Sequence, residues 1–578
     1  MTEGTSTWRR ELLAGASGVA ASALAGCSER FWSHVENTAP EQIELTIKAV
    51  PADDDAVAVK IMSQLRENFQ AAGIDALYEP IAEAELYRDI LLEGDYDVFV
   101  VRHPGFDDID ALHGMLHSQF VSGVGWQNPF HFSDVTVDDY LENQRTASDG
   151  RDEVTVDLLE YLEETVPYTV VAFPHNLGVV RRELPTSFVP KRSFEYVQVM
   201  SLEPSDGPRE TPLEVGVYGE GLTDRLNPLA VDRSRIDGLT ELVYDPLFHR
   251  IDDEYVPWLA DDVSWEESGR TEAVVTLRDG VSWHDGTELD ADDVVFTHRF
   301  LEDTSLGEIE GGHPAPRYRD RQTVVEGVDR IDSLTVRFSF GNTVRQAAAR
   351  SLSIPLFPEH VWEPRSEIVA ERQTQALAVE DEELIGSGLF EIADISDGSV
   401  SLEPYDDHIF RTDDEDRPAI LEGFSQFSGI QFNVAPNPAT MIESIRAGET
   451  DITGTSIPPS EVEAVHDSEE VRLVSSMTNS FYMIGYNAHH PELGNPRFRR
   501  IISRLIDREY TTSELLDGYA EPAETFGSLV GIRDGEWVHR SDPVVSRFPG
   551  TDGEIDVDRV RSLFEDAGYQ YENGTLLE

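Results

Sequence analysis

The sequence predicts an α/β protein built from more than one domain, and three observations support that prediction. Residues 43–102 alternate strand, helix, strand, helix and strand with short loops, which is typical of a parallel sheet. A chain of 578 residues is too long for a single hydrophobic core. A Pro/Gly/Ser-rich segment, residues 201–212, precedes a fresh strand at residues 213–218, as a linker between units would.

The first unit is predicted element by element. Residues 43–50 form a strand and residues 53–55 offer helix N-caps. The helix that follows ends near Gly73, and its apolar face consists of Val57, Ile61, Leu65 and Phe69. The later elements are a strand at 75–81, a helix at 82–93, an apolar strand at 96–102, helices across 135–164 and a strand at 168–173. The loop at 103–110 follows a strand, and open α/β sheets bind ligands at such carboxyl ends.

The middle of the chain is predicted as a strand, two turns and a helix. Residues 274–277 read as the strand, and turns follow at 278–280 and 284–287. Asp290 stands at an N-cap position with Asp293 three residues later, which makes a weak capping box. The helix that follows has one apolar face with Val294, Val295, His298 and Leu301.

Charge narrows the classes of partner. The chain has 111 acidic and 45 basic residues, a formal net charge of −66, and nearly all its positive charge is Arg. Nucleic acid is excluded as a partner, because phosphate binding needs clustered Lys and Arg. A solvated acidic surface of this kind is typical of a salt-loving organism, since molar salt screens the repulsion.

The beginning of the chain predicts export. Residues 1–27 contain the pair Arg9-Arg10, a short apolar run and the single cysteine, Cys27. The apolar run is too short to span a bilayer. The pattern resembles a twin-arginine signal that ends in a lipobox, which implies folded export and lipidation at Cys27. Residues 28–42 are polar and predict a tether.

No enzyme signature is found. The sequence lacks G-x-S-x-G, P-loop, H-E-x-x-H and CxxC motifs, and the 16 histidines are interpreted as isolated, with no pair four apart on a helix face. Acidic residues are too numerous for a catalytic pair to be singled out. We therefore expect a binding protein, without a cofactor or a metal site.

Several stretches resemble the family 5 solute-binding proteins of ABC importers, the dipeptide, oligopeptide and nickel type. They are YDPLFHRIDDEYVPWLADDVSWE (244–266), LRDGVSWHDGTELDADDVVFTHRFL (277–301), IGSGLFEI (385–392), FYMIGYN (481–487), NPRFRRIISRLIDRE (495–509) and VDRVRSLFEDAGYQYENGTLLE (557–578). Trp283 stands where the family usually has Phe. The resemblance implies a two-lobed periplasmic-binding-protein-like fold, type II, that closes on a hinge.

The resemblance also implies a function and a site. The protein would capture a peptide or other small solute between its lobes and deliver it to an ABC permease as a monomer. Candidate ligand-binding residues are His103, Phe106, Asp107, Asp108, Phe481, Tyr482, Tyr486 and Asn487. The family's amine-binding Asp falls on Gly105, and its carboxylate-binding Arg on the stretch Pro51-Ala52-Asp53. An unpaired ligand carboxylate is costly to bury, so a free dipeptide fits poorly and an uncharged, cationic or longer ligand stays open.

The order of the segments predicts a circular permutation. In the family, the segment resembling residues 213–218 follows the signal, and the one resembling 557–578 precedes a strand, helix and ligand loop like those of residues 43–184. The expected domains are a signal (1–27), tether (28–42), part of lobe II (43–167), a return to lobe I with linker (168–205), lobe I with an inserted subdomain (206–478) and the remainder of lobe II (479–578). Glu578 should then lie near Ile43, and strand 43–50 should share a sheet with 481–487.

Three rival interpretations remain. The same cleft could belong to a sensory receptor that reports ligand to a signalling partner. A surface protein with side chains filling the cleft would bind nothing. Residues 43–184 could also be a separate domain fused to a truncated binding protein.

Overall fold

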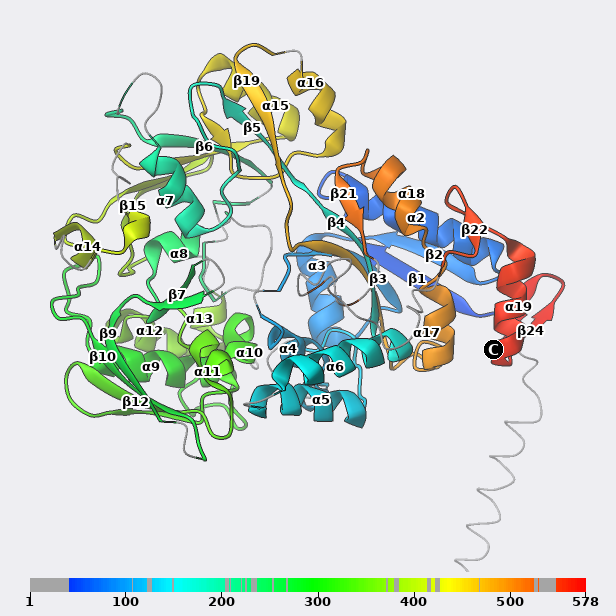
Figure 1. The fold of residues 1–578 in the computed structure, drawn as a ribbon, viewed down its shortest axis with the longest axis horizontal. Coiled ribbons are helices and arrows are strands. Elements are labelled where there is room, and N and C mark those ends of the chain that lie inside the picture. Colours follow the sequence, from blue (N-terminus) through cyan, green and yellow to red (C-terminus); the bar gives the residue numbers. More distant parts are fainter. Residues whose placement is uncertain are drawn as a thin grey trace, which may run out of the picture.

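Two large sheets divide the chain into two lobes in the computed structural model (Figure 1). The described residues are 41–106, 108–121, 127–147, 150–202, 207, 209–219, 221–223, 226–229, 236, 238–251, 254–266, 269–370, 373–378, 384–412, 417–421, 427–466, 468–523, 526, 529 and 547–577. The predicted signal, its Cys27, nearly all of the tether, and Asp107 lie outside them. Among the described residues, no helix is both long enough and apolar enough to cross a membrane.

Lobe II is built on a six-stranded sheet with the order β2-β1-β3-β20-β4-β21. Its strands are β1 (Glu44–Ala49), β2 (Asp75–Pro80), β3 (Val98–His103), β4 (Tyr168–Pro174), β20 (Phe481–Tyr486) and β21 (Ala520–Pro522). The predicted parallel arrangement is confirmed, because β1 pairs in parallel with both β2 and β3. β20 runs antiparallel to β3, with Phe481 opposite His103.

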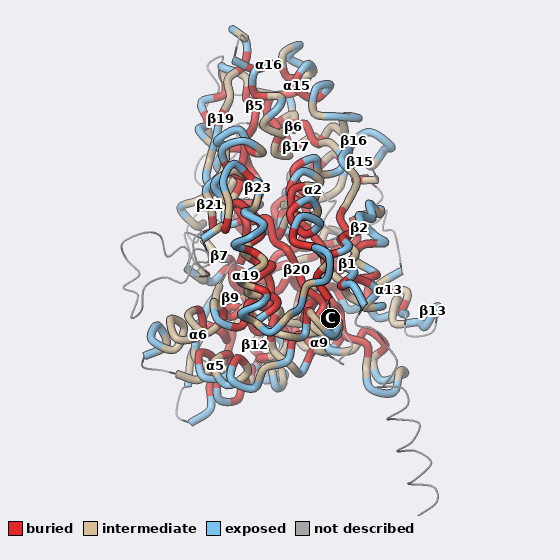
Figure 2. Tube along the Cα trace, turned by 90° about the vertical axis from the view of Figure 1, so that its right-hand side faces the viewer, coloured by how far each residue is buried: buried red, intermediate tan, exposed pale blue. Residues whose placement is uncertain are grey.

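Helices cover both faces of the lobe II sheet. One face packs against α2 (Ala56–Ala71), α17 (Pro496–Ile502) and α19 (Val557–Ala567). The other packs against α3 (Glu83–Arg88), α4 (Ala111–Leu116), α5 (Val135–Thr146) and α6 (Arg151–Thr165). The predicted apolar face of α2 is confirmed as buried, and Asp55 caps the helix by accepting from the N–H groups of Val57 and Ala58. Figure 2 shows the buried strand β20 behind the partly exposed helix α19.

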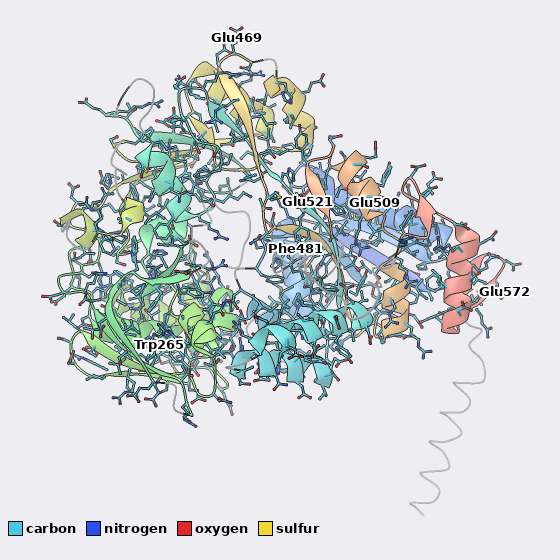
Figure 3. All side chains as sticks on the ribbon, in the orientation of Figure 1. Trp265, Glu469, Phe481, Glu509, Glu521 and Glu572 are labelled. Carbon is cyan, nitrogen blue, oxygen red and sulfur yellow. The ribbon has the colours of Figure 1, made fainter. Side chains whose placement is uncertain are left out.

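Lobe I is built on a seven-stranded sheet with the order β15-β16-β17-β6-β18-β5-β19. Its strands are β5 (Asn176–Arg181), β6 (Leu213–Tyr218), β15 (Phe390–Ser396), β16 (Ser399–Pro404), β17 (Ile430–Ala435), β18 (Ile452–Thr453) and β19 (Val471–Ser476). The helices α7 (Ser193–Ser201), α15 (Pro438–Ala447) and α16 (Val462–His466) contribute to its cores. Exposed acidic side chains such as Glu469 and Glu572 lie on the outer surface of the two lobes (Figure 3).

An inserted subdomain extends lobe I. Its four-stranded sheet has the order β11-β12-β10-β9, from strands β9 (Ala260–Glu266), β10 (Glu272–Leu277), β11 (Gly327–Arg330) and β12 (Thr335–Ser339). The helix α9 (Ala291–Glu302) has the predicted capping box. The Asp290 side chain accepts from the backbone N–H of Asp293, and the Asp293 side chain accepts from the backbone N–H of Asp290. Buried residues of this subdomain belong to the same hydrophobic core as β6, so lobe I is one packed unit.

Residues near both ends of the chain meet in lobe II. Ile43 N donates to Leu576 O at 3.1 Å, and Gln42 bridges to Leu577. Strand β1 shares the six-stranded sheet with β20, as predicted. Residues 43–174 are therefore not an independent domain. The return to lobe I was expected from residue 168, but Tyr168–Pro174 pairs with β20, so the chain crosses at His175 instead.

Candidate functional site

Two chain crossings connect the lobes and form a hinge. The chain passes from β4 to β5 through His175 and returns from β19 to β20 through residues 477–480. The crossings lie beside each other, because Thr478 Oγ1 donates to Pro174 O at 2.9 Å. Only two adjacent strands have to bend for the lobes to move, which is the construction of a hinge.

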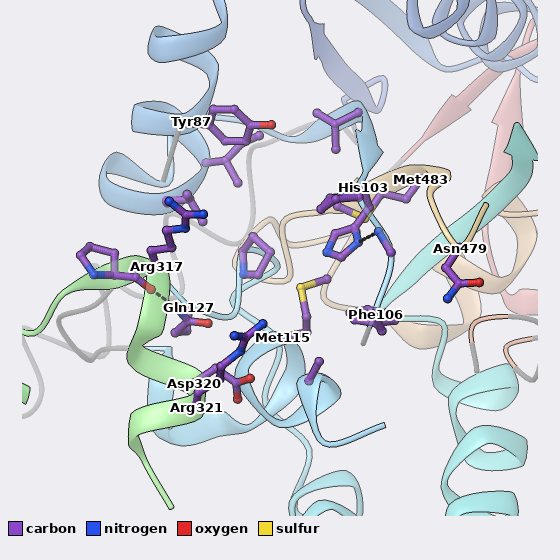
Figure 4. Close-up of a pocket in the computed structure, with 18 of the residues that line it drawn as sticks. Tyr87, His103, Phe106, Met115, Gln127, Arg317, Asp320, Arg321, Asn479 and Met483 are labelled. Atoms are coloured by element: carbon purple, nitrogen blue, oxygen red, sulfur yellow. Dashed lines mark hydrogen bonds between the residues drawn. The ribbon is translucent and has the colours of Figure 1, made fainter. Parts of the chain in front are cut away.

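A cavity of about 380 Å³ lies between the lobes (Figure 4). Its lobe II wall is mainly apolar and includes Ile90, Leu91, Phe99, Val101, Met115 and Met483. Its lobe I wall is polar and contains Arg192, Arg317, Asp320, Arg321 and Arg350. The loop His103–Phe106 borders it, as predicted from its place after β3. A cavity with apolar surface and a few fixed polar groups is typical of a small-molecule site.

Three predicted site residues form one aromatic cluster at this cavity. The ring centroid of His103 lies 4.7 Å from those of both Phe106 and Phe481. His103 Nδ1 accepts a hydrogen bond from Gly105 N, which fixes the loop. Gly105 has φ +100, and a Cβ there would lie 2.6 Å from Asn479 O. The hinge therefore leaves no room for the family's Asp at this position.

Asp108 faces the opposite lobe. Its carboxylate accepts from Gln346 Nε2 of lobe I at 2.8 Å and pairs with Arg151 at 3.2 Å. The carboxylate therefore points across the cleft, and the contact of Asp108 with ligand stays a prediction. The group is already used in an inter-lobe contact, and Asp108 is not among the residues that line the cavity.

Tyr482 lies on the other face of the sheet from its neighbours. Side chains alternate along a strand, so Phe481 and Met483 point toward α3 and α4 while Tyr482 points toward α2. Tyr482 borders a second inter-lobe cavity of about 790 Å³, together with Asp53, Arg102 and Tyr218. Its hydroxyl donates to Asp55 at 3.1 Å. Burial raises the pKa of Asp55, although the Ala58 N–H, Arg102 and Tyr482 oppose that rise.

Tyr486 and Asn487 lie at the far end of β20 and line neither inter-lobe cavity. Tyr486 is buried and shares a 2.6 Å hydrogen bond with Thr169. Asn487 donates to the carbonyl oxygens of Gly94 and Tyr96. Their expected contact with ligand is corrected accordingly, because the strand carries them about five residues away from the hinge.

Sequence reasoning missed the arginines of lobe I. Arg317 donates to Pro228 O at 2.9 Å, and no described carboxylate forms an ion pair with Arg317 or Arg192. Figure 4 shows Arg317 and Arg321 on the left of the cavity and His103 and Met483 on the right. Arg317 and Arg321 stand four residues apart in PRYRDRQ (316–322), and this spacing can be seen in the sequence. Nothing in the sequence connected it with the loop after β3, some 200 residues earlier.

A buried ion-pair network joins the lobes at the edge of the cavity. Asp110 of lobe II accepts from Arg145 of its own lobe and lies 3.3 Å from Arg350 of lobe I. Arg350 also pairs with Asp320 at 2.6 Å. Burial acts to raise the pKa of Asp110, but the guanidinium groups of Arg145 and Arg350 outweigh it and hold that pKa well below its usual range. We call Asp110, Arg145, Asp320 and Arg350 the latch.

A pair of histidines also corrects the sequence analysis. His113 on α4 and His117 at its C-cap lie four residues apart, and their ring centroids are 4.5 Å apart. Glu142 of α5 lies within 3.5 Å of both rings. His117 has an extended backbone just after α4, so the pair does not share a helix face, but the two histidines are not isolated as the sequence analysis expected.

The fold is two-lobed, with a cavity between the hinge and the latch. The family model of the bacterial extracellular solute-binding proteins, family 5 (middle region), matches residues 254–578, more than half of the chain. The chain belongs to this family, which is one of binding proteins rather than enzymes.

Individual relatives are distant. The oligopeptide-binding protein AppA of Bacillus subtilis is 24% identical over 306 residues, which are 52% of this chain and 49% of AppA. The chain thus spans about half the length of this relative. Among solved structures, NikZ from Campylobacter jejuni in complex with Ni(L-His) has a TM-score of 0.43 and 17% identity, covering 64% of this chain and 66% of NikZ. AppA in complex with a nonapeptide has a TM-score of 0.42 and 19% identity, with the same coverages.

Proposed function

We propose that this protein is the extracellular solute-binding protein of an ABC importer. It captures a small solute in the cavity between its lobes and hands it to a membrane permease, acting as a monomer. The observation that carries the proposal is the position of the 380 Å³ cavity, which has the hinge residue Asn479 on one side and the latch residues Asp320 and Arg350 on the other. A solute held there is enclosed when the lobes close.

The solute we propose carries an anionic group and an apolar part. Arg192, Arg317 and Arg321 bring positive charge to one wall of the cavity in a chain whose net charge is −66. Guanidinium groups suit carboxylates and phosphates because they donate several parallel hydrogen bonds. The facing wall of aliphatic, aromatic and thioether side chains suits the apolar part. A peptide bound through its carboxylate fits, with arginines in a different place from those of dipeptide-binding relatives.

The anchor and the habitat are parts of the same proposal. Cys27 would carry lipid after removal of residues 1–26, and residues 28–42 would tether the lobes to the outer face of the membrane. The acidic surface suits a salt-loving organism. The permuted segment order is supported by the pairing of Ile43 with Leu576 and by the sheet that β1 shares with β20.

The proposal is tested on protein purified from molar salt. Mass spectrometry of co-purifying compounds should detect an anionic small molecule, and calorimetry should then give one binding site per chain. The absence of any bound compound, with no binding of acidic peptides, would count against import and for a surface protein without ligand. The neighbouring genes distinguish import from the rival receptor function. Adjacent permease and ATPase genes favour import, whereas an adjacent transducer gene favours sensing.

A further inference from the structure

We propose a transition-metal site on lobe II, outside the ligand cavity, formed by His113, His117 and Glu142. One ligand atom from each residue lies within 4.8 Å of the other two. Two imidazole nitrogens and a carboxylate oxygen suit Zn²⁺, Ni²⁺ or Co²⁺, whereas Mg²⁺ and Ca²⁺ prefer all-oxygen sites. Nothing in the family resemblance, which concerns the cleft, assigns these residues a role.

The distances are close to those that a bound ion requires. Glu142 Oε1 lies 3.2 Å from His117 Nε2 and 3.5 Å from His113 Nε2. Ligands about 2.1 Å from a tetrahedral zinc ion stand about 3.4 Å apart. The two histidine nitrogens lie within 4.8 Å of each other, so rotation of the side chains has to bring them to the spacing of a bound ion.

His113 is held ready for a metal. Its side chain is 1% exposed, so its ring cannot turn freely to solvent. Gln119 Nε2, which can only donate, lies 3.3 Å from His113 Nε2, so the lone pair of this ring nitrogen accepts from Gln119. Gln119 is exposed, and its amide can turn away to free that lone pair for an ion. His113 Nδ1 is buried without a hydrogen-bond partner among the described residues. Hydrogen bonding within the protein therefore does not explain why a histidine is buried here.

His117 and Asp138 supply the next part of the geometry. His117 Nδ1 accepts from Gln119 N in this structure and lies 3.8 Å from Asp138 Oδ1. Metal binding at Nε2 moves the ring proton from Nε2 to Nδ1, which can then donate to Asp138. A carboxylate behind the second nitrogen of a ligating histidine is the usual arrangement in metal sites. His117 is 13% and Glu142 56% exposed, which leaves a route for the ion.

The site lies next to the surface on which the lobes close. A Cβ placed on Gly114 would lie 2.8 Å from Asp320 of lobe I, so α4 touches the opposite lobe at the latch. Ala111 and Met115 of the same helix line the ligand cavity. An ion that joins α4 to α5 therefore fixes the part of lobe II that receives lobe I.

The test is a Co²⁺ titration of the full chain after chelator treatment, in molar KCl with excess Mg²⁺ to occupy surface carboxylates. The visible d–d absorption should saturate at one Co²⁺ per chain and be displaced by Zn²⁺, and Zn²⁺ should raise the melting temperature. His117→Ala and Glu142→Gln, both at partly exposed positions, should each weaken Co²⁺ binding at least tenfold. His489→Ala is the control, since His489 stacks on His131 at 4.5 Å without a carboxylate, and it should bind Co²⁺ as the parent does.

Two results would overturn the site. One is a parent protein that gives no d–d absorption at saturating Co²⁺. The other is binding that Mg²⁺ removes or that His117→Ala leaves unchanged, because the acidic surface alone then explains it. Circular dichroism shows whether each variant is folded before it is titrated.

Discussion

Asp110 Oδ2 and Arg350 Nη1 lie 3.3 Å apart across the inter-lobe boundary, and their side chains are only 1% and 5% exposed. The pair joins the two lobes, because Asp110 belongs to lobe II and Arg350 to lobe I. It is supported on both sides, by Arg145 next to Asp110 and by Asp320 next to Arg350. The contact between the lobes therefore includes a desolvated charge network.

Removal of Arg350 should open the protein. In Arg350→Met, Asp110 keeps Arg145 but loses its partner in lobe I, and Asp320 loses a 2.6 Å contact. We expect the unfolding free energy to fall by about 1–3 kcal/mol and the radius of gyration measured by small-angle X-ray scattering to increase. Arg337→Met, at an exposed position on β12, is the matched control. Scattering identical to the parent would contradict the latch.

Loss of cavity arginines should weaken solute binding. Arg317→Gln or Arg321→Gln removes a charged donor, and a charge-assisted hydrogen bond contributes about 1.5–3 kcal/mol, or roughly tenfold to a hundredfold in affinity. Calorimetry with the co-purified compound measures the change, and Arg299→Gln on the exposed face of α9 is the control. If all three variants bind equally well, the anionic group does not lie at this wall.

Acid should destabilise the protein through His298. This side chain is buried on α9, its Nδ1 lies 2.8 Å from Gln322 Oε1, and burial lowers the pKa of His298 to about 4 despite that hydrogen bond. The unfolded chain, with a histidine pKa of about 6.5, binds the extra proton first. The contribution is thus complete above pH 6.5 and is lost as the pH falls toward 4, by up to about 3 kcal/mol.

Urea denaturation between pH 4 and 7 measures this dependence. His298→Gln should flatten the curve relative to the parent, whatever its stability at pH 7. His466→Gln, at an exposed position, should leave the shape of the curve unchanged. Parallel curves for parent and His298→Gln would show that other groups cause the acid sensitivity.

Cys27→Ser should release the protein from the cell surface. Without the thiol, no lipid can be attached, and the variant should appear in the medium instead of the detergent phase. A single acyl chain binds membranes only marginally, so we expect a diether-type or second anchor on the parent. Mass spectrometry of the mature protein should find residue 27 first; a mature surface protein that retains residues 1–26 would refute the anchor.

Restoring the family's segment order should preserve the fold. A chain that joins residue 578 directly to residue 42 and opens within residues 203–212 keeps every described strand pairing, because Leu577 already bridges to Gln42. Loop closure changes by only about 0.6 kcal/mol for each doubling of length. Circular dichroism and solute affinity should match the parent, and a variant that fails to fold would contradict the permutation.

Local signals explain what the sequence could predict. The helix N-caps at Asp55 and Asp290 depend on residues within one helical turn, so both could be predicted from the sequence. Period-two alternation implies opposite faces of a strand for Phe481 and Tyr482, but it cannot say which face meets the cleft. The register of β4 against β20, and the position of Arg317 and His103 in one cavity, depend on residues hundreds of positions apart. The four-residue spacing of His113 and His117 in HGMLH can be seen in the sequence. The helix that carries His113 is short and weakly periodic, so the sequence did not show that the two rings lie together.

Both described chain ends lie on lobe II, at the edge away from lobe I (Figure 1). With the anchor proposed at Cys27, a 15-residue tether that behaved as a random coil would hold lobe II within roughly 20 Å of the lipid. In the family's usual order, the leash would attach before the strand equivalent to β6, on lobe I. The proposed permutation would thus exchange the roles of the two lobes: lobe II would be tethered to the membrane, and lobe I with its arginine wall would be the half that moves.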